Sequence, residues 1–151
     1  MMHSVEHTKS FAMAVPIARL FPLFSPEGEK LWVPEWDYEN VMGHTELAED
    51  YVFLTRTHDH RAGEAVWVVK RYEPEAHLVE FYKVEPGDKV GTIRVRCTLL
   101  EPDRTEVEVT YRYQALSATG EAFVAGFTAG AYSEFIGEWQ TLLERHFASG
   151  S

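Results

Sequence analysis

The chain has 151 residues, a size typical of one folding domain, so a second hydrophobic core is not expected. Its hydrophobic share of 45% and charged share of 25% are ordinary for a globular protein and exclude a disordered chain. A formal net charge of −10 repels phosphate and anionic lipid, which argues against binding to nucleic acid or to acidic membranes.

Cysteine usage and the N-terminus bear on where the protein resides. Cys97 is the only cysteine, so we expect neither an intramolecular disulfide nor a thiolate metal cluster. The first ten residues carry His, Glu and Lys instead of the basic patch and apolar run of a signal peptide. No stretch approaches the roughly 18 consecutive apolar residues of a membrane span. We expect a cytoplasmic protein without membrane insertion, whose oligomeric state stays open, a homodimer included.

The N-terminal part predicts one strand followed by two short helices. Apolar residues alternate with small ones over residues 11–15, which indicates a strand. Apolar residues then recur at helical spacing over residues 17–24. Ser25 is a typical N-cap, so we expect a second short helix to begin there. Pro34 favours an extended loop over residues 32–38.

From residue 51 onward the hydrophobic pattern changes to a period of two. Five strands separated by turn signals are predicted, over residues 51–57, 64–72, 77–85, 89–100 and 105–116. In the last of them Val107, Val109, Tyr111 and Tyr113 face one way, and polar residues face the other. One apolar and one polar face are typical of an antiparallel sheet that is covered on one side.

The helical period returns after Gly120 and continues to the end of the chain. Residues 119–147 predict one long helix, with Val124, Phe127, Ala131 and Phe135 on its apolar side. At about 1.5 Å per residue such a helix is roughly 40 Å long, enough to cross the whole sheet. The order of elements therefore predicts one α+β domain over residues 1–151, with this helix packed on the sheet.

This order, together with several local motifs, resembles the START-like (SRPBCC) superfamily of helix-grip proteins. That group includes the birch-pollen-allergen type, the polyketide cyclase and aromatase type, and lipid-transfer domains. The motifs are Phe24-Ser25-Pro26-Glu27-Gly28-Glu29, Trp32-Val33-Pro34-Glu35-Trp36, Val66-Trp67-Val68-Val69, Tyr111-x-Tyr113 and Phe135-x-x-x-Trp139. The resemblance implies a helix-grip fold, a curved antiparallel sheet of six to seven strands wrapped around the C-terminal helix, with two short helices after the first strand. It also implies a ligand cavity between sheet and helix, and it transfers no catalytic residue.

We expect this cavity to bind a small hydrophobic or aromatic molecule. The aromatic share of 13% exceeds what a small core requires, although the same residues could simply fill that core. Tyrosine hydroxyls among them could orient a polar group of the ligand, or bond to the backbone. The candidate ligand-binding residues are Trp32 and Trp36 at the mouth, and Phe53, Trp67, Tyr82, Val95, Tyr111, Tyr113, Phe127, Ala131 and Phe135 inside.

Other chemistry-bearing residues carry weaker signals. His58-Asp59-His60 has metal-like spacing but lacks a recognisable third ligand, so we expect no metal and no cofactor. Glu134 and Glu138 lie one turn apart at the edge of the apolar helix face and are interpreted as surface carboxylates rather than as a catalytic pair. Arg94 and Arg96 face solvent by the strand alternation, whereas the opposite register would let them hold a ligand carboxylate.

Three functions remain open at this point. The leading hypothesis is a non-catalytic binder or carrier. The second is a cyclase, aromatase or dehydratase, which requires a buried ionisable group such as Glu138 or His7 in the cavity. The third is a co-chaperone-like interaction module, which requires a filled core and an exposed apolar patch around Trp32 and Trp36.

Overall fold

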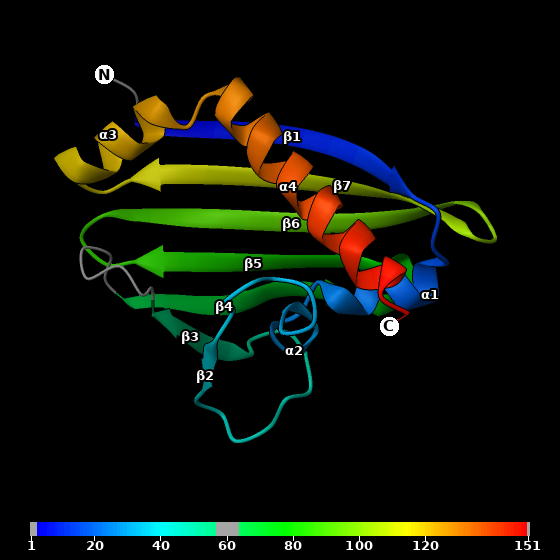
Figure 1. Cartoon of the computed structure of the whole chain (residues 1–151). Helices are drawn as coiled ribbons and strands as arrows, with labels where there is room; N and C mark the ends of the chain where they lie inside the picture. The colour runs from blue at the N-terminus through cyan, green and yellow to red at the C-terminus, as the bar shows by residue number, and fades with distance from the viewer. Residues whose placement is uncertain (1–2, 57–63, 151) are drawn as a thin grey trace.

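The computed structural model describes residues 3–56 and 64–150. Seven strands form one antiparallel sheet in the order β1-β7-β6-β5-β4-β3-β2 (Figure 1). They are β1 (Ser4–Met13), β2 (Tyr38–Asn40), β3 (Val52–Arg56), β4 (Glu64–Glu73), β5 (Leu78–Glu85), β6 (Lys89–Glu101) and β7 (Arg104–Ala115).

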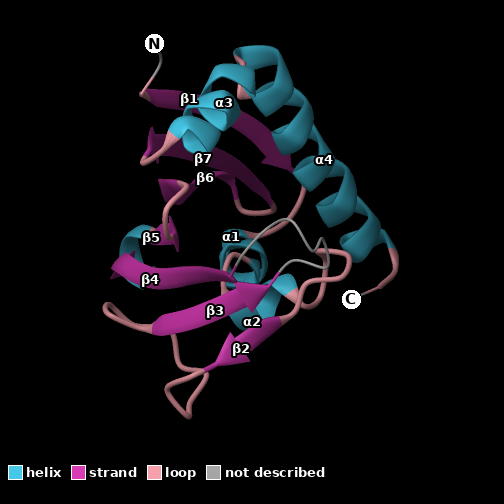
Figure 2. Ribbon diagram, turned by 90° about the vertical axis from the view of Figure 1, so that its left-hand side faces the viewer, coloured by secondary structure: helices cyan, strands magenta, loops and turns pink. Residues whose placement is uncertain are grey.

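The helices cover one side of this sheet. They are α1 (Ile17–Leu20), α2 (Pro26–Glu29), α3 (Ala118–Gly126) and α4 (Ala129–Ala148), with short 3-10 turns η1 (Phe21–Leu23) and η2 (Pro74–Ala76). In Figure 1, α4 crosses the sheet diagonally from β1 toward α1. Figure 2 shows the sheet curving around the space that α1, α2 and α4 occupy. The predicted α+β helix-grip architecture is therefore confirmed. No helix in the described part of the chain is both long and apolar enough to cross a membrane.

The five predicted strands from residue 51 onward are present as β3 to β7, and the predicted facing of the last one is correct. Val107, Val109, Tyr111 and Tyr113 are all buried, and the polar residues between them lie on the other face. The short strand β2 was not predicted. It is an edge strand that follows the loop around Pro34 and pairs only with β3. Three residues carry too little alternation to reveal it.

The predicted single helix over residues 119–147 is wrong, because the chain breaks at Phe127 and Thr128. The backbone of Thr128 is extended, and its Oγ1 accepts a hydrogen bond from the Ala131 amide at 3.1 Å, so it is the N-cap of a new helix. The break frees the Phe127 carbonyl, and His7 Nε2 donates a hydrogen bond to it at 2.7 Å. The two helices can therefore follow the curved sheet where one straight helix could not.

This restart also rotates the buried face of the C-terminal helix. Tyr132, Ile136, Trp139 and Leu143 are its buried residues, spaced as one helical stripe. Ala131, expected at the centre of the inner face, is exposed. The prediction counted positions continuously from Val124, and the Thr128 cap moved the inner face by about one residue.

Candidate functional site

An enclosed cavity lies where α2 and α4 meet the middle of the sheet. Six aromatic and two aliphatic side chains line it, together with one carboxyl group. The residues are Phe24, Glu29, Phe53, Trp67, Phe81, Ile93, Val95, Tyr111 and Trp139. Its volume is about 20 Å³. That is room for roughly one water molecule and far below the size of ordinary ligand pockets, so a ligand needs side chains or a helix to move.

Glu29 is the single acidic residue among the lining residues, and no basic residue is among them. The local fold of α2 places it there. Ser25 caps the helix by accepting a hydrogen bond from the Gly28 amide at 2.9 Å. Residues two apart on a helix point in nearly opposite directions, so when Glu27 turns outward Glu29 turns toward the core. Gly28 packs so closely on Pro22 and Leu23 that a Cβ there would lie 2.3 Å from the Pro22 carbonyl oxygen.

Burial gives the Glu29 carboxyl an unusual acidity. Desolvation in the apolar cavity raises its pKa to about 8, so that it holds its proton at neutral pH. The residue as a whole keeps part of its surface accessible, while the carboxyl end lines the cavity. The neighbouring Tyr111 hydroxyl also has a strongly raised pKa, first from burial and then from the nearby Tyr113 and Glu29. The cavity thus pairs two protonated groups with a hydrocarbon wall.

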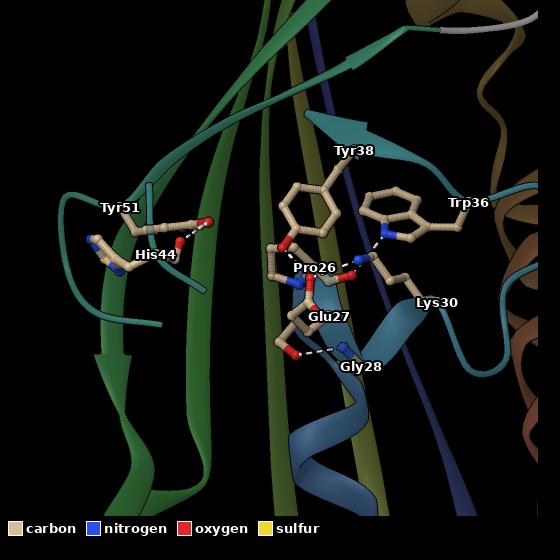
Figure 3. Close-up of polar contacts among 9 residues, drawn as sticks. Pro26, Glu27, Gly28, Lys30, Trp36, Tyr38, His44 and Tyr51 are labelled. Carbon is tan, nitrogen blue, oxygen red and sulfur yellow. Dashed lines mark hydrogen bonds and ion pairs between the residues drawn. The ribbon is translucent and has the colours of Figure 1, made fainter. Parts of the chain in front are cut away.

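Polar contacts anchor α2 over the cavity (Figure 3). Tyr38 on β2 donates a hydrogen bond to the Glu27 carboxylate, and Lys30 Nζ lies 2.9 Å from the same oxygen. Trp36 Nε1 donates to the Pro26 carbonyl at 2.9 Å. We refer to Glu27, Lys30, Trp36 and Tyr38 as the α2 clamp. The hydrogen bonds from Tyr38 and Lys30 lower the pKa of Glu27. The Glu27 carboxyl is therefore ionised at neutral pH, whereas the Glu29 carboxyl is protonated.

The two tryptophans expected at a cavity mouth instead close one side of it. Trp32 is buried, donates to the Leu23 carbonyl at 2.9 Å and packs its ring edge against Trp139. Trp36 is half-buried, and its ring lies across the stacked pair of Phe53 and Trp67. A gating role for them stays a prediction.

The remaining candidate residues divide into three groups. Phe53, Trp67, Val95 and Tyr111 line the cavity. Tyr113 and Phe127 lie toward α3, where both rings pack on Phe123. Phe135 is 38% exposed at the cavity margin, with its ring on those of Tyr111 and Trp139.

Two candidates do not lie in the cavity wall. Tyr82 is 38% exposed on the outer face, beneath the Lys70 ammonium group, because its neighbour Phe81 takes the inward position on β5. Ala131 is exposed, because the helix that starts at the Thr128 N-cap turns Tyr132 instead of Ala131 toward the sheet. An error of one residue in the assigned facing moves a strand side chain to the opposite face of the sheet, and it turns a helical side chain away from the core.

A second ionisable group occupies the inner face beyond the cavity. Lys83 Nζ lies 5.4 Å from the centre of the Trp67 ring, and burial lowers the pKa of this amine. Its neighbours Glu85 and Lys89 act on it in opposite directions. Lys89 itself is buried and pairs with Asp88 at 2.7 Å and with Glu85 at 3.2 Å.

The weaker candidates give little further chemistry. Glu134 and Glu138 are exposed on α4, and Arg94 and Arg96 lie on the outer face, as their alternation predicted. Within residues 3–56 and 64–150, no group of three or more His, Cys, Asp or Glu side chains is placed to hold a metal ion. The string His58-Asp59-His60 lies outside the described residues.

The decisive residue, Glu29, was missed by sequence reasoning. Its signal was weak, since an acidic residue in the first turn of a helix is ordinarily read as a favourable dipole partner. Only the offset of two residues from Glu27, in a helix of one turn, distinguishes the inward from the outward carboxylate.

A larger hollow of about 440 Å³ lies outside this cavity, at the C-terminal end of α4. It is open to solvent and lies between Leu31, Leu142 and Arg145. The inner cavity is the better candidate site, because a desolvated ionisable group, Glu29, lies in its wall.

Comparison with known proteins identifies the fold. No protein-family model and no curated protein sequence matches the chain. Among solved structures, ginseng major latex-like protein 151 from Panax ginseng superposes with a TM-score of 0.71 at 13% identity, over 96% of this chain and 98% of that one. A START superfamily protein from Mycobacterium smegmatis gives 0.69 at 14% identity, over 97% and 99% of the two chains. The Zhui aromatase/cyclase from Streptomyces sp. R1128 gives 0.56 at 17% identity, over 98% and 89%. The chain therefore has the helix-grip fold of the START-like, birch-pollen-allergen-like and polyketide-cyclase-like proteins.

Proposed function

We propose that this protein binds or carries a small hydrophobic or aromatic molecule in the space between its sheet and α4. The observation that carries the proposal is the aromatic cavity, in which six rings surround the Glu29 carboxyl group, and this group has no ion-pair partner among the described residues. A tightly packed core has no need for a carboxyl group there, since burying an unpaired polar group destabilises the fold. A ligand-binding role would explain why a carboxyl group is kept there in spite of this destabilisation. A cytoplasmic location is part of the proposal and is supported by the lone, buried Cys97.

The small cavity volume defines how binding would proceed. At about 20 Å³ the space is nearly closed, so the bound state requires outward movement of α2, α4 or the aromatic side chains. The partly exposed ring of Phe135 at the cavity margin, against Tyr111 and Trp139, is one side chain whose rotation would enlarge it.

Uptake of a neutral dye tests the proposal. Nile red fluorescence should rise on mixing with the wild-type protein, and Phe81→Leu, which enlarges the cavity, should increase affinity several-fold. Val95→Phe fills the cavity and should abolish uptake at a stability cost of about 1–3 kcal/mol. Ala131→Trp adds a large side chain on the exposed side of α4 and serves as the matched control, with unchanged uptake. Folding of each variant is checked by circular dichroism. Equal uptake by Val95→Phe and wild type would show that the dye binds elsewhere.

A second candidate, an acid–base enzyme acting on an aromatic or polyketide-like substrate, is favoured by Glu29 itself. A carboxylic acid with a pKa near neutrality can donate and accept protons at physiological pH. The buried ionisable group that this hypothesis requires is thus present, on α2 rather than at Glu138 or His7. Turnover of a candidate substrate that is lost in Glu29→Gln while binding persists would establish catalysis. Binding without turnover favours the carrier.

The interaction-module hypothesis receives less support. The nearly filled core agrees with it, but Trp32 is buried and Trp36 half-buried, so they form no exposed tryptophan patch.

A further inference from the structure

The chemistry of the cavity wall restricts the kind of molecule that can bind there. Its six aromatic rings present electron-rich faces, and two aliphatic side chains complete the hydrocarbon surface. The single residue with a formal charge in the lining is acidic, and no lysine or arginine is among the lining residues. A ligand that brings a negative charge would therefore meet no compensating cation in the lining itself, since the buried Lys83 ammonium group lies beyond it, over the Trp67 ring.

No described cation neutralises Glu29 from within the protein. Lys30, its neighbour in sequence, pairs with Glu27 on the outer side of α2 at 2.9 Å. Desolvation is the sole cause of the acidity shift of Glu29, with no charge partner contributing to it. The carboxyl group thus lacks the partner that a buried acid normally requires, and the cavity is the place from which one can reach it.

We propose that the cavity is selective for small organic cations, namely aromatic or cyclic amines whose ammonium group pairs with the Glu29 carboxylate while their hydrocarbon body packs on the surrounding rings. The inference rests on the proposed ligand-binding function and names its ligand class. An ammonium group gains a charge-assisted hydrogen bond from the carboxylate and cation–π attraction from aromatic faces within about 6 Å. The net charge of −10 also draws cations toward the molecule. Fatty acids and other carboxylates are disfavoured by the same arrangement.

Proton release is the signature of such binding. Free Glu29 holds its proton up to a pH of about 8, and the ammonium ligand requires the carboxylate form. Amine affinity should therefore rise with pH up to about 8, close to tenfold per pH unit well below that value, while the ligand stays charged. Of the groups around the cavity, Tyr111 on β7 keeps its proton, because burial raises its pKa well above the ordinary value, and Trp139 on α4 does not ionise. Lys83 on β5 lies over the Trp67 ring with a pKa lowered by burial. Its titration persists in Glu29→Gln, so that variant separates the two groups.

Calorimetry with three probes of one shape tests the inference: benzylamine, benzyl alcohol and benzoate. Benzylamine should bind the wild-type protein at least about tenfold more tightly than benzyl alcohol at a pH of about 8, and benzoate should not bind. Glu29→Gln should remove that advantage and the pH dependence, so that benzylamine binds no more tightly than benzyl alcohol. Glu138→Gln, which removes a carboxylate from the exposed face of α4, is the matched control and should behave as wild type.

Buffer-dependent binding enthalpies provide a second readout that needs no variant. Release of about one proton per bound benzylamine near pH 7 supports the pairing with Glu29. Equal affinity for amine and alcohol, no proton release, or an unaffected Glu29→Gln protein would overturn it. Failure of the ligand-binding function looks different, since then Nile red and benzyl alcohol would not bind either.

Discussion

At the scale of single residues, one carboxyl group determines much of the character of the interior. Glu29 and Glu27 are two residues apart on the same helical turn, yet their environments are opposite. Glu27 shares a hydrogen bond and an ion pair with Tyr38 and Lys30, which lower its pKa, whereas burial raises the pKa of Glu29 to about 8. Sequence alone shows two ordinary acids, and only the orientation of α2 distinguishes them.

The raised pKa of Glu29 predicts a pH-dependent cost to stability. The folded protein holds a proton that the unfolded chain releases above the ordinary pKa of 4.5, so stability falls as pH rises from about 4.5 to about 8. Glu29→Gln removes this effect, and its advantage over wild type should grow by about 1.4 kcal/mol per pH unit in that window. Thermal melts at pH values of about 5 and about 8 measure it.

Glu138→Gln is the control for this measurement, since its side chain is exposed on α4. We expect its difference from wild type to be the same at both pH values. If Glu29→Gln also gave a constant difference, the carboxyl would not be desolvated in the folded protein.

The cavity residues show what strand periodicity can and cannot locate. Val95 and Tyr111 were found because side chains alternate along a strand and their neighbours are polar. Phe53 and Trp67 lie between aliphatic residues, so their aromatic character and not the alternation marked them. Tyr82 was misplaced because Phe81 and Tyr82 are both aromatic, so hydrophobicity does not say which of them faces inward. Glu29 could not be found at all, because its orientation depends on how a one-turn helix docks.

At the scale of secondary-structure elements, all strands except β2 and the two short helices after β1 were predictable, and the C-terminal helix only in part. Its amphipathic character came from the repeat of apolar residues, but Thr128 looked like an ordinary polar position. Its role as N-cap depends on the extended backbone at that point, where the Phe127 carbonyl is taken by His7 on β1. A tertiary contact thus decides where the helix begins.

The cap at Thr128 predicts a measurable stability difference. Thr128→Ala removes the acceptor for the Ala131 amide and should lower the free energy of unfolding by about 1 kcal/mol. Thr128→Ser keeps a hydroxyl there and should retain most of the stability. Urea denaturation followed by circular dichroism measures both variants. Equal stability of Thr128→Ala and wild type would mean that the capping bond contributes nothing to the restart of the helix.

At the scale of the whole molecule, the sheet curvature and the helices together close the interior. The polar tethers of this closure lie on two sides. Tyr132 on α4 donates a hydrogen bond to the Val109 carbonyl of β7, and the α2 clamp ties the opposite side to β2. If a ligand reaches the cavity of about 20 Å³ by movement of α2 or α4, one of these attachments has to loosen.

The α2 clamp is the attachment whose release exposes Glu29, which leads to a prediction about uptake rate. Tyr38→Phe removes the hydroxyl that donates to Glu27 and should lower stability by about 1 kcal/mol. If α2 moves aside during uptake, the same variant should speed Nile red uptake several-fold in stopped-flow fluorescence. Tyr82→Phe removes a tyrosine hydroxyl from the outer face of the sheet, away from α2, so it should leave the rate unchanged. Acceleration by Tyr132→Phe but not by Tyr38→Phe would instead place the opening at α4, because that variant weakens only the attachment of α4 to β7.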